Sequence, residues 1–442
     1  MSTLVESLSN VLPEGAYDLL CFESSPFECK NLINSSSQAK ETPVRTIKVK
    51  HFISLLKSGL PLVGIEIYQY LSIFESHVQR YVFVSKVDTT GFSPKGLRIG
   101  KIMQVIVKYF ITLDVKRYGT GVKPRKSSSE EPDENEQNYT IFKLKSSIRR
   151  LQNDPSYFNI ISKYKNFNAP SGDTITFNLP QNVQTSISLF TRAEPQYLYP
   201  NSAKNSGKHV IDGNVLLNWW VATIDKALPA GSTNWDCKLI VPGSDFISTT
   251  KRLPRSTDSV SWSIGSIFDT DQNSLAIHQI PLFPDDPKGR FLEHLVVENR
   301  YKQVYLKDFW EELGFRQEFR LGNVVGIIGC REKGFNDSHG THSSHEAITM
   351  SLKGYKKIMQ LIKGVDYSNI SDVRGSYQEG LQVAMEEVGI KSNFYRRIYG
   401  RLKEDKPRSE PVSTQKSHVG NSTASPATVN DLSGLVKRRK AK

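Results

Sequence analysis

Two adjacent carboxylates, Asp285 and Asp286, stand in a Pro-Asp-Asp-Pro frame, and Lys288 follows them. Proline fixes its own φ and disfavours helix in the residue before it, so this segment is held in one extended or turned shape. The apolar run 277–283 leads into it, so we predict that the acidic pair emerges at the end of a buried strand. A carboxylate placed there suits acid or base chemistry. On spacing alone, a surface turn in which Asp285 caps a helix starting near Pro287 is favoured.

Two other segments could meet phosphate groups. Residues 96–100, Gly-Leu-Arg-Ile-Gly, join a predicted strand to a predicted helix, so backbone N–H groups and Arg98 could bind a phosphate at the helix start. A structural turn explains the same residues equally well. Residues 204–209, KNSGKH, form a polar, basic loop that would suit a cofactor with several phosphates, or plain solvent. No Walker A loop, nucleophile elbow or kinase motif is present.

Aromatic pairs could line a cleft. Trp219 and Trp220 are adjacent on a predicted helix and cannot both point to the same interior, so one of them can face a cleft. We expect Tyr197 and Tyr199, in an extended QYLYP, to point to opposite sides, so that one faces a cavity.

The spacing His339-x-x-His342-x-x-His345 suggests a metal site. It lies in a Ser/Gly-rich stretch without cysteine or a nearby carboxylate pair, so a solvated loop is predicted and no metal is expected.

The composition limits the function classes. The 442 residues carry a net charge of +13, which points to an acidic partner such as nucleic acid, an acidic protein or a phosphate-rich cofactor. The four cysteines have no regular spacing, which argues against a disulfide framework and a zinc ribbon. No secretory signal and no run of roughly 20 apolar residues is found, so we expect an intracellular protein with no membrane partner.

Hydrophobic patterns predict a single large mixed α/β domain, with a central β-sheet surrounded by helices. Three strands are predicted within 45–92, with turns at 58–59 and 90–91. Further strands are predicted at 175–179, 237–243 and 323–330. Helices are predicted at 98–113, 142–151, 213–228 after an Asp212 cap, 288–299, 307–318, 346–364 and 376–400.

Two polar segments interrupt or follow this domain. Residues 117–139 are predicted to be an exposed, disordered insertion, and residues 1–402 to form the folded domain around it. The tail 403–442 is rich in Ser, Thr, Pro and charge and has too little apolar surface to fold alone. Its basic cluster 437–440 would serve nuclear import or bind an acidic partner.

Two long blocks resemble the signature blocks of a known family. FTRAEPQYLYPNSAKNSGKH (190–209) and NSLAIHQIPLFPDDPKGRF (273–291) are similar to those of the fungal histone H3 lysine-fifty-six acetyltransferases, the regulator of Ty1 transposition type. FVSKVDTTG (83–91) and the Trp219-Trp220 helix also match. The resemblance covers roughly residues 10 to 400. It implies a fold similar to the CREB-binding-protein-type acetyltransferases, with acetyl-CoA in a cleft beside the central sheet.

The resemblance also implies site residues. Asp286 falls on the catalytic carboxylate, with Asp285 beside it, and Asp88 and Trp220 fall on positions needed for activity. Lys288 matches a lysine that becomes autoacetylated. The implied acetyl-CoA contacts are Val87, Asp88, Thr89, Gly96, Leu97, Arg98, Ile99, Gly100, Phe190, His209, Val210, Ile211 and Trp219. After Arg192 the chain reads Ala-Glu-Pro, so no side-chain contact from Glu194 is expected. The loop 93–97 also differs, so only backbone contacts are expected there.

These residues agree with acetyl transfer to lysine, which needs a neutral amine, a route for its proton and a stabilised thioester oxyanion. Asp286 could accept the proton or orient the amine, and its Pro-rigid, partly apolar frame would raise its pKa. We expect Trp220 and Tyr199, with Tyr197 nearby, to form an apolar channel for the substrate lysine. Lys288 would pair with Asp286 or Asp88. The phosphates of CoA would be attracted by the positive potential of Arg98, Lys204, Lys208 and His209.

The implied function is that of a nuclear enzyme acetylating newly made histone H3, at lysine fifty-six and in the N-terminal tail. The family works with histone H3–H4 and with chaperones of the nucleosome-assembly-protein and anti-silencing-function types, in replication-coupled chromatin assembly and the DNA damage response. An acidic chaperone would also relieve the repulsion between a basic enzyme and a basic histone. The alternatives are a non-enzymatic nucleic-acid- or histone-binding module, and an acetyltransferase with a non-histone substrate. No basic helix face or RNA-binding pattern indicates sequence-specific nucleic-acid binding.

Overall fold

The computed structural model describes most of the predicted domain. The described residues are 3–34, 42–125, 174–229, 234–269, 271–316, 324–337, 346–391 and 393–403. Several predictions lie outside them, and these are the helix at 142–151, the insertion from 126 onward, His339, His342, His345 and the tail beyond Lys403. Within the described part, no helix is both long and apolar enough to cross a membrane.

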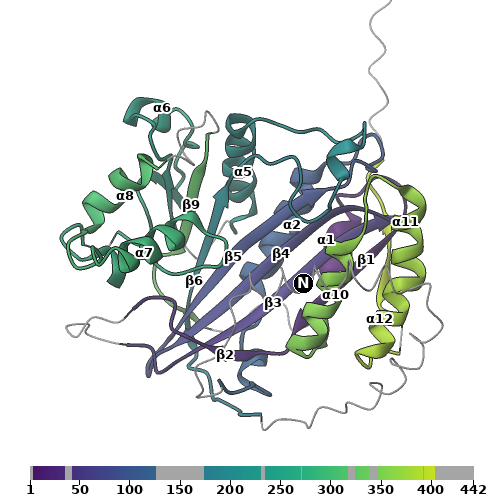
Figure 1. Cartoon of the computed structure of the whole chain (residues 1–442), viewed down its shortest axis with the longest axis horizontal. Coiled ribbons are helices and arrows are strands. Elements are labelled where there is room, and N and C mark those ends of the chain that lie inside the picture. Colours follow the sequence, from purple (N-terminus) through teal and green to yellow (C-terminus); the bar gives the residue numbers. More distant parts are fainter. Residues whose placement is uncertain are drawn as a thin grey trace, which may run out of the picture. The chain divides into compact units, whose positions relative to one another are not determined.

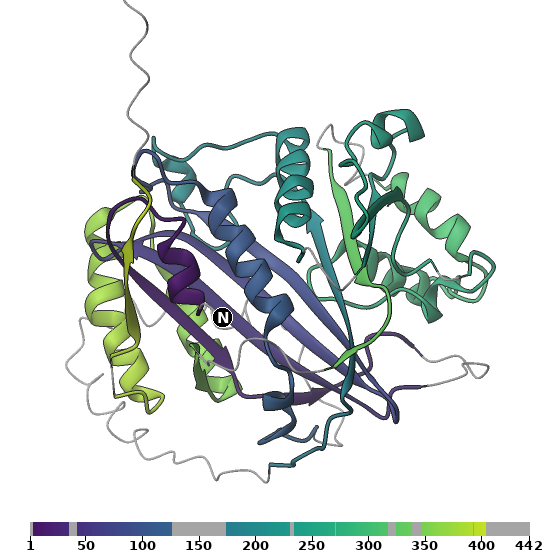
Figure 2. The ribbon, with the colours of Figure 1, turned by 180° about the vertical axis from the view of Figure 1, so that it is seen from behind.

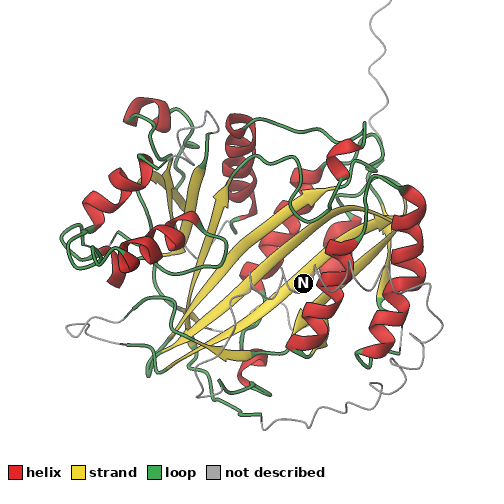
Figure 3. Ribbon diagram, in the orientation of Figure 1, coloured by secondary structure: helices red, strands yellow, loops and turns green. Residues whose placement is uncertain are grey.

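The centre of the fold is a mixed β-sheet, to which twelve strands of the described residues belong (Figures 1 and 3). Its main path runs β11-β1-β3-β4-β5-β6-β9-β7-β8, with β2, β10 and β12 paired beside it. The strands are β1 (Gly15–Ser24), β2 (Phe27–Cys29), β3 (Arg45–Lys57), β4 (Leu60–Ile73), β5 (Val78–Thr89), β6 (Asn182–Thr191), β7 (Trp235–Ile240), β8 (Val260–Ile264), β9 (Gly326–Glu332), β10 (Asn336–Asp337), β11 (Ile348–Met350) and β12 (Tyr395–Gly400).

The three longest strands confirm the prediction for residues 45–92. β3, β4 and β5 pair antiparallel along most of their length. Ser58 and Gly59 join β3 to β4 with φ of 52° and 75°, the left-handed conformation that a tight two-residue hairpin turn requires. The strands predicted at 237–243 and 323–330 are also present, as β7 and β9.

Helices cover both faces of the sheet (Figures 1 and 2). One face carries α1 (Leu4–Ser9), α2 (Ile99–Thr112) and α5 (Gly213–Ala227). The other carries α7 (Pro287–Val297), α8 (Leu306–Gly314), α10 (Leu352–Gly364), α11 (Ile370–Gly375) and α12 (Leu381–Glu387). A short α6 (Phe246–Thr250) follows β7, a π-helical turn (Ser376–Gly380) links α11 to α12, and 3-10 turns lie at Lys116–Gly119, Ser202–Lys204 and Ala276–His278.

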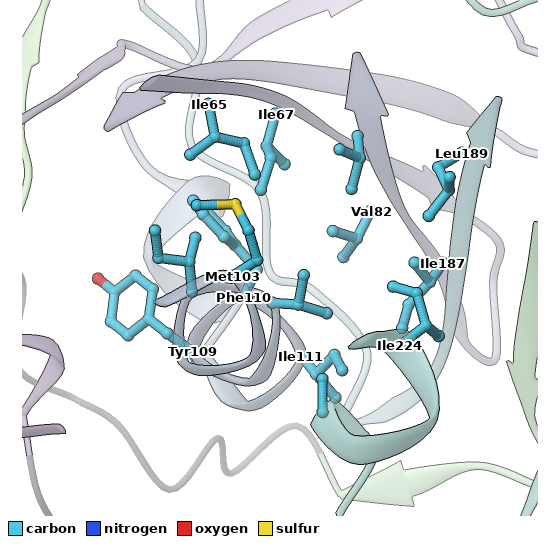
Figure 4. Packing of buried hydrophobic residues seen from close by; sticks show 14 of the residues in the cluster. Ile65, Ile67, Val82, Met103, Tyr109, Phe110, Ile111, Ile187, Leu189 and Ile224 are labelled. Atoms are coloured by element: carbon cyan, nitrogen blue, oxygen red, sulfur yellow. The ribbon is translucent and has the colours of Figure 1, made fainter. Parts of the chain in front are cut away.

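The alternation of strand side chains divides the core into two layers. Val82 and Val84 of β5 pack toward α2 and α5, in the cluster shown in Figure 4. Tyr81 and Phe83 point to the opposite face and pack with the aromatic residues of the 276–313 region. Because neighbouring residues of a strand face opposite sides, one strand serves both layers.

Helix α5 confirms its predicted cap, since the Asp212 carboxylate accepts hydrogen bonds from the backbone N–H groups of Asn214 and Val215. The helices predicted at 98–113, 288–299 and 307–318 are present with shifted ends.

Five element predictions are wrong, and in two of them pairing to the sheet overrides the local pattern. Residues 348–350 and 395–400, predicted as helix, are instead strands that pair along one edge of β1, whose other edge pairs with β3. Residues 175–179 make a single bridge to Val122 rather than a strand. Residues 117–125, assigned to the insertion, belong to the fold, and Tyr118 is buried. The run 277–283 is buried but begins with a 3-10 turn and is not a strand.

Candidate active site

The parallel strands β5 and β6 separate at their carboxyl ends. Their ladder begins at Val78 and stops at the pair Val84 and Leu189. A β-bulge at Ser85 interrupts β5 there, because Ile67 of β4 pairs with Val84 whereas Glu66 pairs with Lys86. Beyond it β5 stays paired with β4, and β6 stays paired with β9. The opening lies at the edge where α/β proteins commonly bind ligands, and bulges often adjoin active sites.

The strand ends beyond this separation carry predicted acetyl-CoA contacts. Val87 and Thr89 lie on the part of β5 beyond the bulge, which no longer pairs with β6 and is called the freed end of β5. Phe190 lies on β6, and all three residues are partly exposed. The hydroxyl oxygen of Ser85 is buried and has no hydrogen-bond partner among the described residues. A buried polar atom without a partner, beside two strands that have separated from each other, fits a site that a polar ligand completes. No pattern in the sequence indicates the bulge, which arises from the pairing register.

The loop after β5 leads into the start of α2. Gly96 has φ of +83°, and α2 begins at Ile99 without a side-chain cap from Arg98. A Cβ at Gly100 would lie 3.3 Å from Nε1 of Trp219, so the first turn of α2 packs closely against α5. The predicted order of strand, glycine loop and helix is therefore confirmed.

The segment before α5 is exposed although it is apolar. Val210 and Ile211 are 55% and 37% exposed, and His209 is also exposed. Trp219 is half-buried, whereas Trp220 is 5% exposed and belongs to the core. The prediction that the two tryptophans face different surroundings is confirmed, and Trp219 is the one available to a ligand.

Asp88 organises the backbone beside the opening. One oxygen of its buried carboxylate accepts hydrogen bonds from the N–H groups of Tyr197, Leu198 and Tyr199, at 2.7, 2.9 and 3.1 Å. The other oxygen accepts from the N–H of Thr89 at 2.8 Å and from Nζ of Lys208 at 2.7 Å. These partners satisfy the carboxylate, so Asp88 fastens β5 to the 197–208 segment and does not face a substrate as an acid or base.

Lys208 is bound rather than open to phosphate. Its ammonium donates to Asp88 and to the hydroxyl of Ser202 at 2.7 Å, and its side chain is 4% exposed. We expected Lys208 to attract the phosphates of CoA. Its charge is neutralised by Asp88, so that expectation is corrected.

Asp286 and Lys288 form a buried ion pair at the start of α7. Their side chains are 0% and 2% exposed, and an oxygen of Asp286 contacts Nζ of Lys288 directly. Nζ also lies 4.8 Å from the ring centre of Phe283. Burial lowers the pKa of Lys288 to about 7. The predicted pairing of Lys288 is confirmed, with Asp286 and not Asp88 as its partner.

Asp286, and not Asp285, caps α7. Its carboxylate accepts a hydrogen bond from the backbone N–H of Lys288 at 3.2 Å, and Pro287 occupies the first turn. Asp285 has φ of 57°, a conformation that aspartate tolerates better than most residues, and its side chain is 67% exposed. The predicted cap by Asp285 is therefore wrong by one residue, because the turn directs Asp285 outward.

The predicted lysine channel is not formed by Trp220 and Tyr199. Tyr199 is fully buried, its hydroxyl lies 3.1 Å from that of Ser54, and it belongs to a different cluster from Trp220. Tyr197 is 40% exposed and is the tyrosine that faces outward. Residues two apart would share a face in a regular strand, but this segment bends, so the two rings differ in exposure.

Two further polar features bear on the site. Glu194 pairs with Arg192 at 2.7 Å. Within the described part of the chain, no group of three or more His, Cys, Asp or Glu side chains is placed to hold a metal ion.

Comparison with known proteins identifies the family. The family model of the histone acetyltransferase KAT11-type domain matches residues 4–383. Histone acetyltransferase RTT109 of Candida albicans is 33% identical over 365 residues, which cover 82% of this chain and 96% of that one. Histone acetyltransferase rtt109 of Schizosaccharomyces pombe is 25% identical over 273 residues, or 58% of this chain and 69% of that one.

A solved structure supports the fold independently. The crystal structure of Rtt109 from Aspergillus fumigatus matches with a TM-score of 0.64 at 21% identity, covering 91% of this chain and all of that one. The mixed sheet flanked by helices is thus the fold of that protein. The family model matches most of the chain, and the Candida albicans relative is 33% identical to it. The chain therefore belongs to the KAT11-type histone acetyltransferases.

Proposed function

We propose that this chain transfers the acetyl group of acetyl-CoA to lysines of newly made histone H3, at lysine fifty-six and in the N-terminal tail. The family supports histone acetylation. The observation that carries the site assignment is the buried Asp286–Lys288 pair on a proline-bounded turn, in contact with aromatic rings. Low local polarity disfavours an ammonium and so favours the neutral amine that acetyl transfer requires.

The proposed cofactor site follows the opening between β5 and β6. Val87, Thr89 and Phe190 would flank the acetyl and pantetheine part, and backbone groups of 96–100 would receive phosphates at the start of α2. Trp219 and the exposed segment 209–211 would contact the rest of the nucleotide. Arg98, exposed beside the helix start, supplies positive charge there.

The proposed chemistry is a direct transfer within a ternary complex. The substrate amine attacks the thioester carbon, the N–C bond forms, and the C–S bond breaks. The proton lost from the amine passes to Asp286 or to water, and the CoA sulfur leaves and is protonated. Asp286 can accept that proton directly only when its carboxylate is not paired with the ammonium of Lys288.

Autoacetylation of Lys288 is part of the proposal. With its pKa near 7, a sizeable fraction of Lys288 is neutral at physiological pH and can act as a nucleophile. Acetylation would remove the positive charge that pairs with Asp286 and leave that carboxylate available to the substrate amine.

The proposed partners and compartment follow from charge. A chain of net charge +13 and a basic histone repel each other, which favours an acidic chaperone of the nucleosome-assembly-protein or anti-silencing-function type that presents H3–H4. Residues 437–440 would act as a nuclear-import signal, in keeping with roles in chromatin assembly and DNA repair. Import of a reporter fused to 403–442, compared with a fusion in which 437–440 are replaced by alanine, tests this part.

The decisive experiment measures acetyl transfer from acetyl-CoA to H3–H4, with and without an acidic chaperone, for wild type and Asp286→Asn. We expect acetyl-lysine on H3 with wild type, a loss of at least about 100-fold in kcat for the variant, and stimulation by the chaperone. A variant with near-normal kcat would remove Asp286 from the chemistry. A folded protein that neither binds CoA nor transfers acetyl, yet binds duplex DNA in a salt-sensitive manner, would favour a binding module.

A further inference from the structure

The two sides of the candidate site are joined by an ion pair outside the buried Asp286–Lys288 couple. Nζ of Lys86 lies 2.8 Å from a carboxylate oxygen of Asp285, and the two side chains are 22% and 67% exposed. Lys86 directly follows the bulge at Ser85, on the freed end of β5. Asp285 directly precedes Asp286 on the turn that starts α7. The pair therefore spans the strand that flanks the proposed cofactor site and the turn that holds the carboxylate.

The carboxylate that lies opposite Lys86 in the sheet already has other partners. Glu66 lies opposite Lys86 in the β4–β5 ladder and is buried. Its carboxylate accepts hydrogen bonds from the hydroxyls of Tyr68 and Tyr355 and lies 3.4 Å from Nζ of Lys363. Glu66 thus has three other partners, and Lys86 forms a short ion pair with Asp285.

The turn that carries Asp285 needs support from outside. Its φ of 57° lies in the left-handed region, where a side chain other than glycine costs roughly 1 kcal/mol or more. Burial by itself would raise the pKa of Asp285, but its hydrogen bond to Lys86 and the charges of Lys86, Lys363 and Arg290 lower that pKa. Asp285 therefore remains ionised and paired at neutral pH.

We propose that Lys86 is a positioning residue, which through Asp285 sets the distance between Asp286 and the freed end of β5. The inference rests on the proposed function, because that function places the substrate amine at Asp286 and acetyl-CoA beside β5. Loss of the pair would let the turn move relative to the strand, and a displacement of about 1 Å at a reacting group can cost up to about 100-fold in rate. Cofactor binding would be conserved, because none of the residues of the proposed cofactor site lies on the turn that carries Asp285.

The test is a double-mutant cycle with Lys86→Met and Asp285→Asn. Methionine keeps most of the length of the lysine side chain without its charge, and asparagine tolerates the left-handed backbone. We expect each single variant to lower kcat for histone acetylation about tenfold, while KM for acetyl-CoA changes less than about twofold. We expect the double variant to match the singles, because both remove one interaction. Lys86→Arg, which retains the charge, should recover most of kcat.

Controls distinguish the positioning role of Lys86 from a general loss of stability and from failure of the proposed function. Lys108→Met changes an exposed lysine on α2, far along that helix from its start, and should keep wild-type kcat. Wild-type kcat in Lys86→Met, additive losses in the double variant, or a fall in kcat matched by a fall in thermal stability would each overturn the positioning role. Absence of acetyl transfer by the wild type itself would instead refute the proposed function, so the two failures are distinguishable.

Discussion

Nζ of Lys208 lies 2.7 Å from a carboxylate oxygen of Asp88, and both side chains are buried. The same carboxylate also accepts four backbone hydrogen bonds, three of them from consecutive residues of the 197–199 segment. The end of β5 and the 197–208 segment are therefore held together by one charged group. This arrangement gives a structural reason for the expectation that Asp88 is needed for activity, although its carboxylate does not face the substrate.

The first prediction is that replacing Asp88 destabilises the fold more than replacing Lys208. Asp88→Ala should lower the free energy of unfolding by about 3–5 kcal/mol, because it leaves the Lys208 ammonium and several N–H groups without a partner. Lys208→Met should cost less, about 1–3 kcal/mol, because Asp88 keeps its four backbone donors. Urea unfolding measures both. The exposed Glu293→Gln serves as the control, and equal losses for the two variants would contradict the asymmetry.

A second prediction concerns Gly64, which faces Tyr199. A Cβ at Gly64 would lie 2.1 Å from the Tyr199 hydroxyl oxygen, so Gly64→Ala must displace that ring and should cost about 1–3 kcal/mol. Combining it with Tyr199→Phe should recover part of the loss. Gly375→Ala in α11 is a matched control, since nothing lies within 4 Å and alanine favours helix. Strictly additive losses in Gly64→Ala and Tyr199→Phe would show that the ring is not the obstacle.

A third prediction separates the two tryptophans. Trp220→Ala should lower stability by about 3–5 kcal/mol, because it empties a core position. Trp219→Ala should leave stability within about 1 kcal/mol and raise KM for acetyl-CoA several-fold, because the half-buried ring borders the proposed cofactor site. Thermal unfolding and steady-state kinetics distinguish them. An unchanged KM in Trp219→Ala would remove this residue from the site.

A fourth prediction concerns the pH dependence of Lys288 acetylation. Burial lowers the pKa of Lys288 from 10.5 to about 7, and only the neutral amine attacks the thioester. The initial rate of autoacetylation should therefore rise about tenfold per pH unit below 7 and level off above it, rather than near 10. Mass spectrometry of the peptide containing Lys288 measures the rate, with Lys288→Arg as the control. A rate that continued to rise to pH 9 would show that Lys288 keeps its ordinary pKa.

Local sequence determined the elements that carry the site. The alternating residues of 45–89, the Asp212 cap of α5 and the glycine loop before α2 were predictable, because each depends on neighbours a few residues apart. The Pro-Asp-Asp-Pro turn was also predictable, because proline restricts the backbone locally. The family followed from two long blocks whose match the comparisons confirm.

Only the tertiary structure decided what the site residues do. Asp88 meets the 197–199 segment more than 100 residues away, and Lys86 meets Asp285 across almost 200 residues. Strands β11 and β12 were predicted as helix, because their pairing with β1 is invisible to a local pattern. A carboxylate's role depends on which donors surround it and how much water is excluded. Those conditions arise from packing between distant segments, and spacing along the chain does not encode them.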